Sequence, residues 1–299
     1  MTEKSATDAS HRWEEAVLPR PGRSFLFLRW REARGPAKAN IILMHGMGEH
    51  SARYLHVGEF FSENGYRVCA SDLRGHGRSP GRRGDVESYG ALLDDLDAVF
   101  RHYHGEGRES FLYGHSLGGQ LLINFFLKYR PPISGAVVAS PWLELVFRPK
   151  PFKLFLARLA LAVFPGLTQS SGLDDDSRLS RDRDFLLSMK DLDLVHQRMS
   201  ARMFDELSRG ARRAAENAKA FDCPALFLHG AEDSVTSRAA TEEFFRKAGA
   251  QDKALLIYPD TRHETHNDCG RKQVLADVVE WMDRHLRGSE AAKPLTASS

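Results

Sequence analysis

The sequence predicts an α/β fold in which a mostly parallel central sheet is flanked by helices. Short runs of β-branched, aromatic and aliphatic residues alternate with longer segments of helical periodicity, which is the pattern of repeated βαβ units. Several strand-like runs are apolar throughout, as expected for strands that are buried on both faces of a sheet. The alternation is interrupted once, between residues 142 and 213, and this interruption predicts an insertion.

The runs define the individual elements in chain order. The predicted strands are 25–30, 40–44, 67–71, 110–113, 135–139, 225–229 and 254–258. The predicted helices are 52–64, 86–104, 116–129, 239–248 and 270–286. The interruption shows no convincing strand and contains helical pieces around a turn at 169–176 that is rich in Gly, Ser and Asp. We therefore expect a helical cap on the face of the sheet where the strands end.

This interruption divides the chain into three parts. Residues 1–142 are expected to form the first part of the α/β core, and residues 143–213 a helical cap or lid. Residues 214–299 are expected to complete the core, with a disordered tail after about residue 288.

The composition is that of a globular protein. Hydrophobic residues make up 42% and charged residues 27% of the 299 residues, and a chain of this length can bury a large core. The 42 basic and 40 acidic residues nearly cancel to a net charge of +2. Nucleic acid is therefore not an expected partner, because its binding depends on a strongly basic surface.

The cysteines, the polar N-terminus and the short length of the apolar stretches favour a cytoplasmic location. The three cysteines lack the spacing of a zinc site, and Cys69 and Cys223 lie in or beside apolar runs, as buried thiols would. Buried free thiols suit a reducing compartment. The polar N-terminus lacks the apolar core of a signal peptide, and the longest apolar stretch, Leu154–Phe164, is too short to span a bilayer.

The pentapeptide Gly114-His115-Ser116-Leu117-Gly118 fits the pattern G-x-S-x-G of a nucleophile elbow. An apolar strand-like run leads into it and a helix-like segment leaves it, in the strand–turn–helix order that the elbow requires. The glycines avoid Cβ clashes at the sharp turn, and the serine hydroxyl is left exposed above the sheet. Ser116 is therefore the candidate nucleophile, with a simple helix cap as the alternative role.

A serine nucleophile requires a base that takes its proton and a carboxylate that orients the base. In this type of fold the partners follow in the order serine, acid, histidine. Asp233 follows the predicted strand 225–229, and His263 follows the predicted strand 254–258. Both are therefore expected at the same edge of the sheet as Ser116, as acid and base respectively.

Each of these two positions has competitors. Glu232 and Asp260 are alternative acids on the same loops, and His266 is an alternative base. The segment from His263 to His266 does not fit the helical zinc motif H-E-x-x-H, because that motif places its histidines four residues apart. No metal and no cofactor are expected.

Two backbone N–H groups are expected to bind the oxyanion that forms during acyl transfer. One belongs to Leu117, the residue after the nucleophile. The other is expected from the loop His45-Gly46-Met47-Gly48-Glu49-His50, whose glycines allow close approach of the backbone to a ligand, and Met47 is the candidate. A metal site formed by the histidines of this loop is disfavoured, because a glycine-rich turn holds ligands loosely.

These motifs resemble the monoacylglycerol lipases and bacterial lysophospholipases of the α/β-hydrolase superfamily, over residues 41–286. The most specific segments are His45–Tyr54, Ser71–Gly81, Gly114–Gly119, Asp191–Arg202 and Cys223–Val235. The resemblance implies an α/β-hydrolase fold with a lid over an acyl-chain pocket. It also implies a nucleophile, acid and base at Ser116, Asp233 and His263, with oxyanion donors at Met47 and Leu117. Arg262 departs from the pattern, since a less charged residue is expected before the histidine.

The resemblance implies hydrolysis of fatty-acyl esters of monoacylglycerols or lysophospholipids. A thioesterase, peptidase or acyltransferase could use the same triad, because fold and triad do not determine the acyl donor. A non-catalytic binding module is a further alternative, but it predicts loss of a triad member, and all three are present. In the expected cap, Phe147–Phe164 combines bulky apolar and basic residues, which suits either peripheral contact with an anionic membrane or packing on the core.

Overall fold

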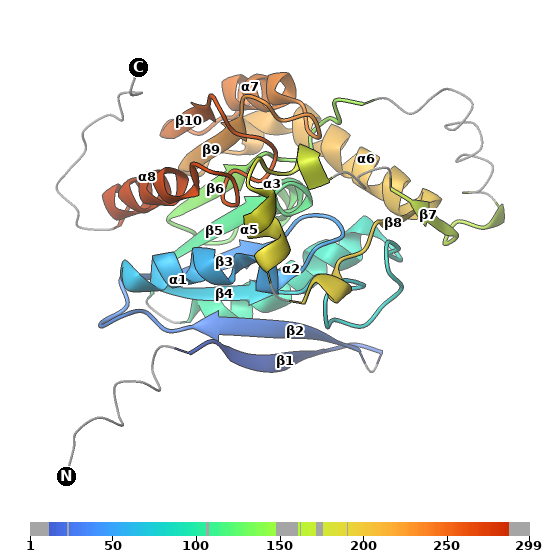
Figure 1. The fold of residues 1–299 in the computed structure, drawn as a ribbon, viewed down its shortest axis with the longest axis horizontal. Helices are drawn as coiled ribbons and strands as arrows, with labels where there is room; N and C mark the ends of the chain where they lie inside the picture. Colours follow the sequence, from blue (N-terminus) through green and yellow to red (C-terminus); the bar gives the residue numbers. More distant parts are fainter. Residues whose placement is uncertain are drawn as a thin grey trace, which may run out of the picture.

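The computed structural model describes residues 12–22, 24–105, 108–147, 161, 163–171, 176–189 and 191–286. Its centre is an eight-stranded sheet with the strand order β1-β2-β4-β3-β5-β6-β9-β10 (Figure 1). The strands are β1 (Glu14–Arg20), β2 (Ser24–Arg31), β3 (Ala39–Met44), β4 (Tyr66–Ser71), β5 (Ser110–His115), β6 (Gly135–Ala139), β9 (Ala225–Gly230) and β10 (Lys253–Tyr258). The six strands from β4 to β10 in this order pair in parallel. The strand β2 pairs antiparallel with both of its neighbours, β1 and β4.

Helices lie on both faces of this sheet (Figure 1). They are α1 (Leu55–Glu63), α2 (Tyr89–His104), α3 (Leu117–Tyr129), α5 (Arg183–Ser188), α6 (Ala201–Glu216), α7 (Arg238–Lys247) and α8 (Arg271–Arg284). Short 3-10 turns are present at Ser51–Tyr54, Asp176–Arg178, Leu192–Leu194 and Ala218–Ala220.

The alternation of side chains along each strand divides the core into two layers. In β3, Ile42 belongs to the layer that contains buried residues of α2, α3, α6 and α7, whereas Ile41 and Leu43 belong to the layer formed with α1 and α8. All three β3 side chains are buried, as are their neighbours in β5 and β6. The central strands are therefore covered on both faces, which explains why they are apolar throughout.

The predicted α/β fold is confirmed, and each of the seven predicted strands overlaps a strand of the sheet. Three strands were not predicted. The edge strand β1 has a half-exposed pattern with few apolar residues, so it carries only a weak strand signal. In the insertion, β7 (Thr168–Ser170) and β8 (Arg198–Ser200) form a separate two-stranded sheet, and the expectation of no strand there was wrong. Strands of three residues are too short to show a period.

The end of the insertion is marked by α6, which packs on α3. The side-chain amides of Gln120 and Asn124 in α3 donate to the carbonyls of Leu207 and Gly210 in α6, both at 3.1 Å. The predicted boundary at residue 213 therefore lies inside a helix that is bound to the core. Most of the segment 147–164 and the tail after 288 lie outside the described residues. Among the helices that are described, none has both the length and the apolar character to cross a membrane.

Candidate active site

Ser116 lies at the sharp turn between β5 and α3, with backbone angles φ 53° and ψ −115°. A positive φ is costly for a residue with a Cβ and persists only where the surroundings enforce it. The Ser116 N–H donates to the Ala139 carbonyl at 2.9 Å, and its carbonyl accepts from the N–H groups of Gln120 at 3.1 Å and Trp142 at 3.0 Å. These bonds hold the strained residue in place.

The two glycines of the pentapeptide are required by close backbone contacts. A Cβ at Gly114 would lie 2.5 Å from the carbonyl oxygen of Gly118. A Cβ at Gly118 would overlap the carbonyl oxygen of Met44 at the end of β3. The tight approach of α3 to β3 and β5 therefore depends on both glycines, in agreement with the predicted strand–turn–helix arrangement.

Asp233 and His263 meet at the ends of neighbouring strands, on the loops after β9 and β10. His263 Nδ1 lies 2.8 Å from Asp233 Oδ2. The other carboxylate oxygen of Asp233 accepts from the backbone N–H groups of Val235 at 2.7 Å and Thr236 at 2.9 Å. The Thr236 hydroxyl and His229 Nε2 contact Oδ2 at 2.8 and 3.2 Å. The carboxylate is thus held firmly beside the imidazole.

The same contacts shift the ionisation of both groups. Burial alone would raise the pKa of Asp233, but His263 and His229 beside it lower that pKa well below its ordinary value. Burial alone would lower the pKa of His263, but the charge and hydrogen bond of Asp233 raise it above 6.5. The carboxylate therefore remains ionised, and the imidazole gains affinity for a proton.

The competing residues lie in different surroundings. The side chains of Glu232 and Asp260 are 46% and 87% exposed, and both lie near the guanidinium of Arg181 at the surface. His266 is fully buried and stacks on Tyr54 with a centroid distance of 4.6 Å. Among the described residues, the ion pairs of Glu232 and Asp260 are with arginines, whereas Asp233 bonds to His263 directly.

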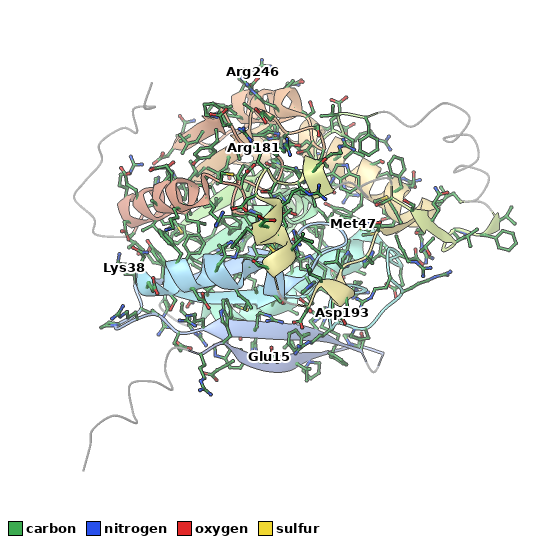
Figure 2. The ribbon with its side chains drawn as sticks, viewed as in Figure 1. Glu15, Lys38, Met47, Arg181, Asp193 and Arg246 are labelled. Carbon is green, nitrogen blue, oxygen red and sulfur yellow. The ribbon has the colours of Figure 1, made fainter. Side chains whose placement is uncertain are left out.

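Ser116, His263 and Met47 line one cavity, with an empty volume of about 720 Å³ that is partly open to solvent. The apolar part of its lining includes Met47, Trp142, Leu145, Leu179, Val195 and Val235. Met47, labelled in Figure 2, lies on the loop after β3. A Cβ at Gly46 on that loop would lie 3.3 Å from the Cβ of Ser116, so the loop runs directly beside the serine. Leu117 is fully buried at the start of α3.

A buried ion-pair network in the same cavity was not predicted from the sequence. The Arg53 guanidinium bonds to Glu49 at 3.0 Å and to both carboxylate oxygens of Glu264 at 2.7 and 2.8 Å. Glu49 Oε1 also accepts from the Gly46 N–H at 2.5 Å and from the Tyr54 hydroxyl at 2.7 Å. The network therefore joins the loop after β3 to the loop that carries His263.

Part of this network is visible in the sequence. Glu49 and Arg53 are four residues apart, a spacing typical of an ion pair on one helical turn. The contact with Glu264 spans 211 residues and depends on the fold, so no local pattern indicates it. Burial would lower the pKa of Arg53, but Glu264 and Glu49 raise it above its ordinary value, so this guanidinium is permanently charged.

His45 fixes the start of the loop after β3. Its Nε2 accepts from the Leu73 N–H at 2.9 Å, so its Nδ1 carries the proton and donates to the Gly46 carbonyl at 2.7 Å. Burial lowers the pKa of His45 to about 4, which keeps the ring neutral. Within the part of the chain that the structure describes, no group of three His, Cys, Asp or Glu side chains could hold a metal ion.

Comparison with known proteins places this geometry in a family. Residues 35–270 match the family described as serine aminopeptidase, S33 (Hydrolase_4). The chain belongs to that family. A monoacylglycerol lipase of Mycolicibacterium smegmatis is 29% identical over 250 residues, which cover 82% of this chain and 88% of that protein.

Two further similarities complete the comparison. The crystal structure of Paleococcus ferrophilus monoacylglycerol lipase shares 31% identity and a TM-score of 0.79, covering 87% of this chain and 99% of that one. An uncharacterized abhydrolase domain-containing protein of Dictyostelium discoideum is 30% identical over 260 residues, but this chain spans only 27% of its length. The predicted resemblance, the α/β-hydrolase fold and the class of serine hydrolase are confirmed.

The ionisation of the histidines can be measured directly. We expect the imidazole of His263 to titrate above 6.5, because Asp233 stabilises its charged form. Burial lowers the pKa of His115 and His266, so both rings should remain neutral over the same range. Imidazole NMR resonances followed from pH 5 to 9 would show this, and Asp233→Asn should lower the pKa of His263. A pKa of His263 below 6.5 in the wild type would contradict the arrangement.

Proposed function

We propose that the protein hydrolyses fatty-acyl carboxylic esters, with Ser116 as nucleophile, His263 as general base and Asp233 as the carboxylate that orients the base. The observation that carries this proposal is the 2.8 Å bond from His263 Nδ1 to Asp233, together with a cavity that both His263 and Ser116 line. An imidazole bonded to a carboxylate through Nδ1 has Nε2 available for the serine proton.

The reaction takes place in two halves. Ser116 Oγ attacks the acyl carbonyl carbon while His263 Nε2 takes the hydroxyl proton. The tetrahedral intermediate collapses, the bond to the alcohol oxygen breaks, and His263 returns the proton to the leaving alcohol. Water then attacks the acyl-enzyme with His263 again as base, and the fatty acid and the free Ser116 hydroxyl are formed. No cofactor takes part in these steps.

The N–H groups of Leu117 and Met47 are our proposed oxyanion donors. Leu117 is the first residue of α3, and N–H groups in the first turn of a helix have no acceptor within the helix. Met47 lies on the loop that runs beside Ser116, and Gly46 is fixed by Glu49. Removal of one such donor costs on the order of 10²–10³ in rate in other hydrolases.

The charges in the cavity favour a neutral alcohol group in the substrate. The described acidic and basic side chains that line the cavity, apart from histidines, are Glu49, Arg53 and Glu264, two carboxyl groups and one guanidinium, so their formal charges sum to −1. A phosphate headgroup placed near them would meet a net negative field, and the only guanidinium among them is already bonded to both carboxylates. We therefore propose a monoacylglycerol rather than a lysophospholipid as the preferred substrate.

The same contacts disfavour a peptidase. An aminopeptidase recognises the positively charged amino terminus of its substrate, for which a carboxylate is the natural partner. Glu49 and Glu264 are both bonded to Arg53, so neither is presented to an ammonium group. Thioesterase and acyltransferase activities use the same catalytic groups and differ in the acyl donor or acceptor, so they are tested by the choice of substrate.

Turnover by matched variants tests the proposed function. Wild type should hydrolyse a monoacylglycerol faster than a lysophospholipid with the same acyl chain. Ser116→Ala, His263→Ala and Asp233→Asn should each lower kcat by roughly 10⁴-fold or more, because each removes a member of one catalytic unit. Asp260→Asn removes the same charge from the exposed alternative acid and should behave as wild type. Full activity of His263→Ala, or no turnover of either lipid by wild type, would contradict the proposal.

We also propose that this protein is located in the cytoplasm and contacts membranes peripherally through its cap. Val163, Phe164 and Leu167 are 58%, 65% and 60% exposed, and Arg82 lines the same surface hollow as these three. Exposed apolar side chains beside a cation suit an anionic lipid surface. Cys69, Cys223 and Cys269 are free thiols, as expected in a reducing compartment.

Vesicle sedimentation tests the membrane contact. Wild type should sediment with anionic vesicles at low salt and be released at high salt, because screening weakens the attraction between basic side chains such as Arg82 and the headgroups. The double variant Phe164→Ser and Leu167→Ser should sediment less, while its turnover of a short soluble ester is unchanged. Equal sedimentation with and without vesicles at low salt would contradict the proposal.

A further inference from the structure

Part of the insertion is fastened to the loop that carries His263. We call residues 176–189 the cap segment and residues 259–270 the base loop. Both sequence neighbours of His263 bond to the cap segment. The Glu264 N–H donates to the Leu179 carbonyl at 2.8 Å, and the Arg262 side chain donates to the carbonyls of Ser177 at 2.5 Å and Ser180 at 3.3 Å.

Asp268 makes a further connection between the base loop and the cap segment. Its carboxylate is fully buried, and backbone N–H groups donate to both of its oxygens. Oδ2 accepts from the Arg262 N–H at 2.7 Å, which closes the base loop around His263. Oδ1 accepts from the Cys269 N–H at 2.8 Å and from the Arg181 N–H of the cap segment at 3.0 Å. Arg181, labelled in Figure 2, belongs to the cap segment.

The bonds of Asp268 go beyond the capping of a helix. Asp268 lies shortly before α8, and its bond to the N–H of Cys269, the next residue, is a local contact of the turn that precedes the helix. Arg262 and Arg181, however, lie outside α8, one directly before His263 and the other in the cap segment. Loss of the carboxylate would leave both N–H groups without this acceptor and would loosen the base loop and its attachment to the cap segment, while the bonds of Glu264 and of the Arg262 side chain remain.

We propose that Asp268, together with the side chain of Arg262, positions the base His263 by fastening its loop to the cap segment. This inference rests on the proposed function, in which His263 is the base. It also gives a role to Arg262, the residue that departs from the family pattern. The position of the cap segment and the geometry of the base are thereby coupled through two residues that do not line the cavity.

Kinetics normalised to active sites test this role. Asp268→Asn keeps the size of the side chain but replaces one acceptor oxygen with a donor. Its kcat, divided by the number of sites titrated with a phosphonate, should fall on the order of 10²-fold, the effect expected of a misplacement near 1 Å. KM for a short soluble ester should change less. The acid limb of the pH profile should move to lower pH, because His263 would lose its close contact with Asp233.

A matched variant separates positioning from folding. Asp277→Asn makes the same chemical change on α8, where the carboxylate accepts from Tyr258 and Gln273 in the described part of the chain, and it should behave as wild type. If Asp268→Asn lowers only the fraction of titratable sites, with kcat per site and the acid limb unchanged, Asp268 is merely structural and the proposal is wrong.

Arg262→Ala provides a second test if Asp268→Asn does not fold. It removes the side-chain bonds to the cap segment and a 4.0 Å ion pair with the half-exposed Glu232, and it keeps the backbone bond to Asp268. It should show a smaller fall in kcat per titrated site, and an unchanged value would overturn the proposal. His263→Ala, measured beside these variants, tests the proposed base separately. If His263→Ala is fully active, the choice of base is wrong whatever Asp268→Asn shows.

Discussion

Parallel pairing of the central strands determines where every residue of the candidate site lies. Because β3, β5, β9 and β10 run in the same direction, their carboxyl ends meet at one edge of the sheet. The register brings Met44 opposite Gly114 and Ile257 opposite His229, so the loops that follow these strands begin at similar heights. Four segments that are distant in sequence thus supply the serine, the acid, the histidine and the loop beside the serine.

The strand ends alone do not determine the positions of the side chains, and buried polar contacts provide the remaining restraints. Arg53 connects Glu49, which holds the Gly46 N–H, to Glu264 beside His263. Removing one partner of a buried ion pair typically costs about 3–5 kcal/mol, because the other charge remains buried and unpaired. Asp268 adds a separate restraint by accepting from the backbone N–H groups of Arg262, next to His263, and of Arg181 in the cap segment. The base loop is therefore restrained from both the core and the cap.

Local sequence patterns were sufficient for the elements that carry the candidate site. The apolar runs before Ser116, Asp233 and His263 predicted three strands, and the order of these residues along the chain predicted one sheet edge. Short or half-exposed elements such as β1 and β7 left no clear period. The bonds of Arg53 to Glu264 and of Arg262 to Ser177 join residues 211 and 85 positions apart. Only the folded chain brings such pairs together, so no local pattern could indicate them.

The most direct test of a serine nucleophile is to locate the covalent adduct that it forms. An active-site phosphonate should modify the folded wild-type protein at one residue, and peptide mapping by mass spectrometry should place the adduct on Ser116. His263→Ala should react far more slowly, because the hydroxyl would lose the base that takes its proton. An adduct on any other residue, or no adduct on a folded wild-type protein, would contradict this account of the site.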